Sequence, residues 1–448
     1  MGYLQQIAFV LVVAAAIWIL ARRIRQIRRA INLGKDADFS DHSSERWRTM
    51  ALVAFGQKKM FKRFIPAFFH FLIYVGFLVI NIEVLEFILD GIFGTHRLFA
   101  PFLGGFYNIL MNIFEFLAVG VLVACVVFLW RRNVKKVRRF FAREMTGWPK
   151  LDANLILIIE IVLMLAILTM NASDQLLQVR DPEHYTSTGP LFFSGLMVPL
   201  FENMSTASLV VVERFAWWFH IIGILAFAVY ITYSKHLHIF MAFPNTYYSR
   251  LKPKGEMDNM DMVTNEVKMM LGLQSDGDAA PANPDEIGRF GAKDVNDLTW
   301  KSIMGAFACT ECGRCTSECP ANQTGKLLSP RKIMMDTRDR AEEVIRSMDK
   351  GGKGLEDGKS LLGDYVTKEE INACTTCNAC VEACPVNINP LEIILDMRRF
   401  VAMEESGSPA SWNAMFQNIE TNFAPWKFPT TDRFKWADNI TIKEDKGV

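Results

Sequence analysis

Five long apolar runs, separated by short polar segments, occupy the first half of the chain. They cover residues 7–21, 65–89, 106–130, 155–170 and 215–233. A helix needs about 20 apolar residues to cross about 30 Å of hydrocarbon. We therefore expect five transmembrane helices, of which the first and fourth extend about one turn into the flanking polar sequence. The second half lacks such runs, and its residues 330–348 show helical periodicity, so the pattern predicts an all-α protein.

Basic residues flank these runs unevenly. Arginines and lysines follow the first, third and fifth runs and precede the second, whereas the loops at residues 90–105 and 171–212 carry little besides Arg97 and Arg180. We expect the protein to lie in the cell inner membrane. The positive-inside rule then places the N-terminus outside and the C-terminal half in the cytoplasm. The charges after the first run, with no cleavage site in view, distinguish that run from a secretory signal.

Three histidines fall within or beside the apolar runs. Ionisable residues at membrane depth indicate function. His220 and His238 are 18 residues apart, about five helical turns or about 27 Å along one face of a continuous helix, whereas His236 points to the opposite face. His70 lies at the depth of His238, and two neutral imidazoles can clamp a b-type haem iron. The alternative is that these histidines only hydrogen-bond to neighbouring helices. His42, His96 and His184 are interpreted as surface residues.

The segments around these histidines resemble the γ subunit of respiratory nitrate reductase, a cytochrome b. The similarity lies in Phe-His-Phe-Leu-Ile-Tyr-Val-Gly around His70 and in Ser-Lys-His-Leu-His-Ile-Phe around His238, together with His220. The resemblance implies that His70 and His238 hold the haem nearer the cytoplasm and that His220 faces a second haem nearer the outside. The family has another histidine where this chain has Ile80. The outer haem would then be five-coordinate, take a ligand such as His96, or be missing, so we expect one haem and leave the second open.

Two compact groups of cysteines mark the second half. Four lie within residues 309–319 and four within residues 374–384, and each group reads Cys-x2-Cys-x2-Cys-x3-Cys-Pro. Thiolates at this spacing hold [4Fe–4S] clusters, and in two-cluster ferredoxins the fourth cysteine of each group binds the other cluster. We therefore expect one cluster on Cys309, Cys312, Cys315 and Cys384, and the other on Cys374, Cys377, Cys380 and Cys319.

Zinc is the alternative occupant of these groups. A zinc site needs a tetrahedron of ligands, usually two pairs separated by a longer loop, which these dense quartets fit poorly. The ninth cysteine, Cys125, lies alone in an apolar run. Two quartets in a long chain indicate metal ligation in a reducing compartment and not a disulfide scaffold.

The cysteine-rich region resembles the α-helical ferredoxin domain of the HdrC-type iron–sulfur subunit of heterodisulfide reductase and of the iron–sulfur subunits of anaerobic glycerol-3-phosphate dehydrogenase and succinate dehydrogenase. The resemblance rests on the helical insert between the groups and on Leu-Leu-Ser-Pro-Arg-Lys after the first. We expect a membrane domain over residues 1–245, a juxtamembrane segment and linker over 246–299, with a solvated stretch at 274–286, the dicluster domain over 300–400, and a tail over 401–448 that packs on its own domain or on a partner.

No dinucleotide fingerprint, nucleophile triad, metallohydrolase motif or paired Cys-Cys-Gly module occurs, and no patch suits nucleic acid. The chain is thus expected to relay electrons within a quinone-linked oxidoreductase complex. In this interpretation menaquinone or ubiquinone exchanges electrons with b haem in the lipid bilayer, and two [4Fe–4S] clusters exchange them with a cytoplasmic Cys-Cys-Gly-type or flavin subunit. The alternatives are the reverse flow, in which a dehydrogenase reduces quinone, and a membrane-tethered iron–sulfur sensor or scaffold without haem.

Overall fold

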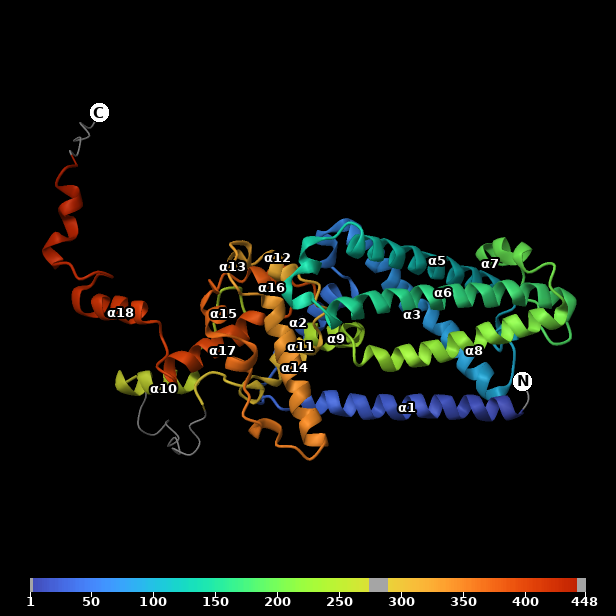
Figure 1. The fold of residues 1–448 in the computed structure, drawn as a ribbon, viewed down its shortest axis with the longest axis horizontal. Helices are drawn as coiled ribbons and strands as arrows, with labels where there is room; N and C mark the ends of the chain where they lie inside the picture. The colour runs from blue at the N-terminus through green and yellow to red at the C-terminus, as the bar shows by residue number, and fades with distance from the viewer. Residues whose placement is uncertain (1–2, 274–288, 441–448) are drawn as a thin grey trace.

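The computed structural model describes residues 3–273 and 289–440, and within these residues it is built from helices and contains no strand (Figure 1). This confirms the predicted all-α class. Five helices in the described part of the chain are long and apolar enough to cross a membrane. They are α1 (Tyr3–Ile31), α3 (Phe64–Phe93), α5 (Gly105–Asn133), α6 (Trp148–Arg180) and α8 (Thr206–Ile231).

Each helix covers one of the predicted apolar runs, except that α8 ends two residues before the end of the fifth run, and the first and fourth helices extend furthest beyond theirs. Helix α1 has 29 residues and α6 has 33, because polar residues can continue a helix once its apolar part is established. Helix α6 packs against both α5 and α8, α3 packs against α5, and α1 lies against α3 and α8. Many apolar side chains of α1 are exposed on the outside of the bundle, which suits contact with lipid.

The bundle has two distinct ends. We call the end where α1, α5 and α8 finish and α3 and α6 begin the near end, and the opposite one the far end. The cysteine-bearing residues 289–403, hereafter the cluster region, lie against the near end (Figure 1). All the basic runs noted in the sequence flank the near end, so the charge bias and the position of the cluster region agree.

The cluster region is organised around one long helix between the two cysteine groups. This helix, α14 (Pro330–Asp349), begins where Ser329 accepts a hydrogen bond from the backbone N–H of Lys332, a normal N-cap. Its predicted apolar stripe, including Ile333, Val344 and Ile345, is buried. The other helices are α11 (Trp300–Phe307), α12 (Arg314–Ser317), α13 (Pro320–Gln323), α15 (Lys368–Asn372), α16 (Ala379–Ala383) and α17 (Pro390–Met403).

The core of the cluster region includes the end of the first transmembrane helix. Ile27 and Ala30 of α1 belong to the same buried apolar cluster as Ile303 and Ile333. Beyond α1, Lys35 exchanges backbone hydrogen bonds with Leu298 and Trp300. The bundle and the cluster region therefore share a core and are not joined only by the linker.

The sequence interpretation of one continuous helix from His220 to His238 is wrong. Helix α8 ends at Ile231, and a new short helix, α9 (His238–Tyr247), follows a 3₁₀ turn. The break is held by Asp152 of α6, whose carboxylate accepts hydrogen bonds from Ser234 Oγ at 2.6 Å and from the Lys235 backbone N–H at 3.2 Å. The Asp152 side chain, from the neighbouring helix α6, thus stabilises the turn in which the chain changes direction before α9.

The remaining α-helices are short, and some of their apolar residues, such as Phe193, Met197 and Ala100, pack in the cores of the bundle. The predicted linker at residues 274–286 falls outside the described residues. Tail residues 404–440 extend away from the rest of the molecule (Figure 1), and Trp412, Trp426 and Trp436 are exposed. The packing of the tail on its own domain or on a partner stays a prediction. These helices are α2 (Ser43–Met50), α4 (Ala100–Leu103), α7 (Phe192–Met197), α10 (Asp261–Met270) and α18 (Ala410–Asn422).

Candidate redox sites

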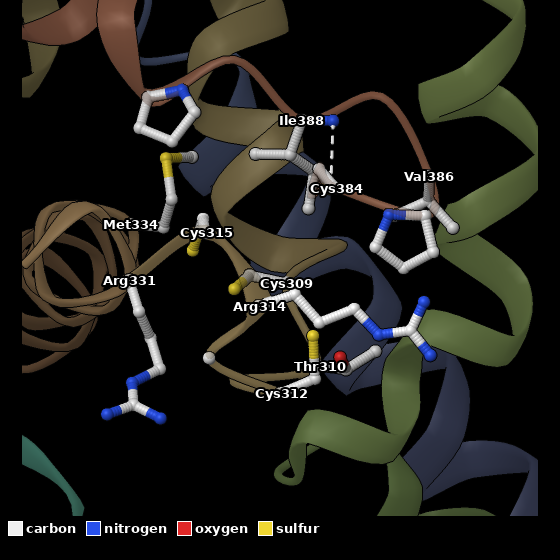
Figure 2. Close-up of a pocket in the computed structure, with 13 residues that line it drawn as sticks. Cys309, Thr310, Cys312, Arg314, Cys315, Arg331, Met334, Cys384, Val386 and Ile388 are labelled. Atoms are coloured by element: carbon white, nitrogen blue, oxygen red, sulfur yellow. Dashed lines mark hydrogen bonds between the residues drawn. The ribbon is translucent and has the colours of Figure 1, made fainter. Parts of the chain in front are cut away.

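Four cysteines of the two groups line one cavity beside the near end. Cys309, Cys312 and Cys315 come from the loop before α12 and from α12 itself, and Cys384 reaches the cavity from the second group (Figure 2). Met334 and Ile388 complete the apolar wall. The structure thus brings together the four residues that the sequence assigns to one site, which we call the first site.

The other four cysteines are the ones that the sequence assigns to the other cluster, and we call them the second site. Burial and the neighbouring Cys374 and Cys319 thiols raise the pKa of Cys380 to about 12, and Cys319 and Cys377 likewise lie within electrostatic range of Cys374. Cys319 and Cys380 are buried, whereas Cys377 is exposed. Cys319 of the first group therefore lies near Cys374 and Cys380 of the second group.

The two cysteine loops have the same backbone conformation. Glu311 and Thr376, each two residues after the first cysteine of their group, have φ of 54° and 55°. Each donates its backbone N–H to that first cysteine, at 3.4 Å to Cys309 Sγ and 3.4 Å to Cys374 Sγ. Left-handed residues turn the chain so that amides point towards the thiols, an arrangement that favours negative charge on sulfur.

The cysteines and their surroundings fit iron–sulfur ligation better than a cluster of buried thiols that binds no metal. Burial raises the pKa of Cys309 to about 12, so its thiolate is stable there only beside a compensating positive charge such as a metal centre. Arg398 adds a cation beside the second site, where it donates to the carbonyls of Ile371 at 2.9 Å and Asn372 at 3.2 Å. Four sulfur ligands per site and backbone donors are the protein's part in holding a [4Fe–4S] cluster.

A pair of imidazoles lies in the near end of the bundle. The ring centroids of His70 on α3 and His238 at the start of α9 are 6.3 Å apart, with an interplanar angle of 41°. His70 Nδ1 donates to Gln57 Oε1 at 3.2 Å, and His238 Nδ1 donates to the Lys235 carbonyl at 3.2 Å. Because each Nδ1 is engaged, each Nε2 is left as the nitrogen able to bind a metal.

His236 does not point away from His238, as the continuous-helix interpretation requires. Its ring centroid is 5.4 Å from that of His238 and 5.5 Å from that of Phe227. The break after α8 reverses the expected orientation. Burial lowers the pKa of His236 to about 3 and that of His238 to about 4, so both imidazoles are neutral at physiological pH.

His220 lies apart from this pair. It is buried, and its Nδ1 donates to the Leu163 carbonyl at 3.0 Å. No other histidine ring contacts it among the described residues, and its aromatic neighbour is Phe87, at a centroid distance of 5.9 Å. Trp217 and Phe9 pack in the same core cluster. Among the described residues, His220 is therefore held by the Leu163 carbonyl and the Phe87 ring.

His96 is not the free surface residue that the sequence suggests. Its Nε2 lies 2.9 Å from Asp174 Oδ1, and its Nδ1 accepts the Thr186 backbone N–H at 3.3 Å. Both ring nitrogens are occupied, so it is unsuited to bind a metal. Asp174 also pairs at 3.0 Å with Arg97, which is buried.

Arg97 is the centre of a buried polar network at the far end that sequence reasoning missed. It donates to Asn171 Oδ1 at 2.8 Å and lies 3.9 Å from Glu83 Oε1. The one signal in the sequence that could have indicated this role is that Arg97 is the single arginine or lysine of the loop at residues 90–105. Burying several carboxyls around one guanidinium is stable only when each is hydrogen-bonded or protonated.

Ion pairs connect the near end to the cluster region. Lys235, in the turn after α8, contacts the carboxylate of Glu311, which lies between Cys309 and Cys312, and both side chains are buried. Arg338 of α14 pairs with the same carboxylate at 2.9 Å. Although burial raises the pKa of Glu311, Arg338 and Lys235 lower it below its ordinary value overall, so the carboxylate is ionised.

Three more contacts join the same two parts. Arg23 pairs with Glu342 at 2.6 Å, Arg63 with Glu318 at 2.7 Å, and Arg331 with Glu144 at 2.7 Å. Several basic residues that the sequence assigns only to membrane orientation therefore also fix the cluster region.

Comparison with known proteins defines the class. Residues 308–388 match the family model of the 4Fe-4S dicluster domain. The chain is thus an iron–sulfur protein whose dicluster domain follows helices able to span a membrane. No solved structure matches the chain.

Three curated relatives extend this. The chain is 27% identical to the probable iron-sulfur-binding oxidoreductase FadF of Bacillus subtilis (strain 168), over 98% of this chain and 62% of that protein. It is 26% identical to the EtfAB:quinone oxidoreductase of Syntrophomonas wolfei subsp. wolfei, over 90% of this chain and 56% of the relative. Over 34% of this chain and 38% of the relative, it is 28% identical to the HdrD-type subunit of the dihydromethanophenazine:CoB--CoM heterodisulfide reductase of Methanosarcina barkeri. The chain spans about three fifths of the first two relatives, and all three support electron transfer through iron–sulfur clusters.

Proposed function

We propose that this protein is a membrane electron relay that joins a quinone pool, through one b-type haem on His70 and His238, to two cytoplasmic [4Fe–4S] clusters and a soluble redox partner. The first site supplies Cys309, Cys312, Cys315 and Cys384, and the second supplies Cys319, Cys374, Cys377 and Cys380. In this proposal the bundle spans the cell inner membrane, the cluster region lies on its cytoplasmic side and the N-terminus lies outside. The basic residues at the near end favour this orientation.

The spacing of His70 and His238 carries the proposal. Two iron–nitrogen bonds of about 2 Å, with about 1 Å from each nitrogen to its ring centre, put two ligating imidazole centroids about 6 Å apart. The observed separation is 6.3 Å. Gln57 and the Lys235 carbonyl hold the two rings so that each Nε2 is available. A bound haem would supply reversible one-electron storage between the bilayer and the clusters.

The relatives support the two ends of the relay. The name of the Syntrophomonas wolfei protein pairs EtfAB with quinone, and that of the Methanosarcina barkeri protein pairs dihydromethanophenazine with a heterodisulfide. In this chain, the histidines of the membrane part and the two cysteine sites would connect the quinone to the soluble partner. The resemblance to the γ subunit of nitrate reductase and to the HdrC-type iron–sulfur subunit of heterodisulfide reductase is part of this proposal.

The test is the reduced-minus-oxidised optical spectrum of the purified full chain. We expect a b-type α-band that disappears in His70→Ala and in His238→Ala, with iron and sulfide content unchanged. His184→Ala is the matched control, because that ring is exposed and pairs only with Asp181 within its own loop, and it should keep the band. Wild-type protein with two clusters and no α-band would instead support the tethered sensor or scaffold.

Flow towards quinone is a second candidate, favoured by the EtfAB:quinone oxidoreductase that matches 90% of this chain. In that direction a soluble donor reduces the clusters and the membrane part reduces quinone. Redox titration of both clusters against menaquinone distinguishes the directions. Clusters well below the quinone potential favour quinone reduction, and clusters above it favour quinol oxidation.

A further inference from the structure

The two cysteine sites differ in what surrounds them. The loop of the first site faces the bundle: Glu311 contacts Lys235 in the turn that leads to His238, and Arg331 of α14, which lines the first-site cavity, donates to the Arg139 carbonyl at 2.8 Å. Arg314, next to Cys315, lies within electrostatic range of His70. The first site is therefore in direct contact with the elements that carry the imidazole pair.

The second site opens to solvent. Cys377 is the one exposed cysteine among the two quartets, and Thr375, two residues before it, is also exposed. The equivalent loop of the first site is more enclosed, since Cys312 and Thr310 are only half-exposed.

The second group does touch the membrane part, through α16 and the residues just after it: Lys62 pairs with Glu382, and Asn245 of α9 donates to the Val386 carbonyl at 2.6 Å. Lys59 donates to the Val381 carbonyl at 3.1 Å and to Asn387 Oδ1 at 3.0 Å. That contact lies beside Cys384, which belongs to the first site. The bundle thus approaches the part of the second group that serves the first site. Among the described residues, no hydrogen bond or ion pair joins the bundle to the loop from Cys374 to Cys377.

We propose that the first site is the cluster that exchanges electrons with the membrane haem, and that the exposed Cys374–Cys377 loop of the second site is the docking point for a soluble one-electron redox protein. The proposal rests on the proposed function and fixes the order within it. Each transfer would move one electron. With an electron-accepting partner, one electron would pass from the cluster held by Cys309, Cys312, Cys315 and Cys384 to the cluster held by Cys319, Cys374, Cys377 and Cys380, and from there to the partner. With a donor as partner the same order runs in reverse.

Equivalent positions in the two loops allow the clusters to be told apart without removing a ligand. Glu311 and Thr376 share their place after the first cysteine, their φ and their hydrogen bond to sulfur. Glu311→Gln removes a negative charge beside the first cluster and should raise its midpoint potential. Thr376→Glu adds one beside the second cluster and should lower its potential. Redox-poised EPR of the full chain then identifies each reduced-cluster signal.

The test is microwave power saturation of these signals with and without a soluble dysprosium chelate, which speeds the relaxation of clusters near solvent. We expect the chelate to raise the half-saturation power of the signal shifted by Thr376→Glu several-fold, and to change the signal shifted by Glu311→Gln little. A larger or equal effect on the Glu311→Gln signal would overturn the proposed order. Should Glu311→Gln fail to assemble, Thr376→Glu alone still identifies the second signal.

Failure of the proposed function gives a different result. If the protein binds no haem, the α-band is absent, while the chelate experiment still reports which cluster faces solvent. With haem present, the oxidised iron should speed the relaxation of the first-cluster signal and not the second. Relaxation of the second signal by haem would contradict the order even though the relay itself stands.

Discussion

His70 and His238 face each other in the near end, 6.3 Å apart between ring centroids, although 168 residues of sequence separate them. The break after α8 is what makes this approach possible. Asp152 accepts the Ser234 hydroxyl and the Lys235 N–H, which turns the chain so that α9 starts with His238 beside α3. Asp152 is thus a positioning residue for the imidazole pair.

The first prediction concerns haem count. We expect one haem per chain, because His220 meets Phe87 and not a second imidazole. His220→Ala should therefore keep the whole α-band in the pyridine haemochrome assay, normalised to protein. Two haems per chain in the wild type, with one lost in His220→Ala, would show that the far end also binds haem.

The second prediction concerns Gln57, which is buried and accepts the Nδ1–H of His70. Gln57→Glu should lower the haem midpoint potential, since a carboxylate acceptor makes the imidazole a stronger donor to iron. Optical redox titration measures the change. Gln417→Glu in the exposed helix α18 adds the same charge away from the site and should leave the potential unchanged; an equal shift in both variants would argue against a role for Gln57.

The third prediction concerns the junction between the bundle and the cluster region. Lys235→Met should destabilise the junction by about 2 kcal/mol, because it removes one of the two cations that pair with the buried Glu311 carboxylate. Thermal unfolding in detergent, followed by loss of cluster absorbance, measures this. Arg29→Ala removes a more exposed ion pair with Asp349 at the same junction and should cost less than about 1 kcal/mol. Equal effects would contradict the importance of the buried contact.

The fourth prediction separates two acids of the far-end network. Asp174 accepts from Arg97, His96 and Gln178, so Asp174→Asn should cost about 3 kcal/mol. Glu83 Oε1 accepts no hydrogen bond in the described residues, and Glu83→Gln should cost less than about 1 kcal/mol. Chemical unfolding in mixed micelles compares them. A costlier Glu83→Gln would mean that this carboxylate is ionised and essential to the network.

Much of this architecture follows from local sequence patterns. Apolar runs of membrane length predict the five helices, and the stripe with Ile333 and Val344 predicts α14, because both depend on periodicity along the chain. The grouping of Cys384 with the first three cysteines was expected from the ligation pattern of two-cluster ferredoxins. His236 was misjudged because a helix break depends on Asp152, which is 84 positions away in the sequence.

Other features could not be predicted because their partners come from distant elements. Arg97 reads as a loop residue until Asp174 of α6 is placed beside it. Lys235 reads as an orientation signal until Glu311 is found in contact with it. Buried ion pairs of this kind depend on tertiary packing between distant segments, so no periodic pattern in the sequence predicts them.

The most direct test of the relay is electron exchange between a quinone and the clusters in the full chain. Anaerobic stopped-flow absorbance can follow haem and clusters after mixing with menadiol or menadione, whichever the measured potentials require. We predict that haem and clusters respond in wild type, and that in His238→Ala the clusters no longer respond to the quinone although dithionite still reduces them. Clusters in His238→Ala that exchange with the quinone at the wild-type rate would contradict the account.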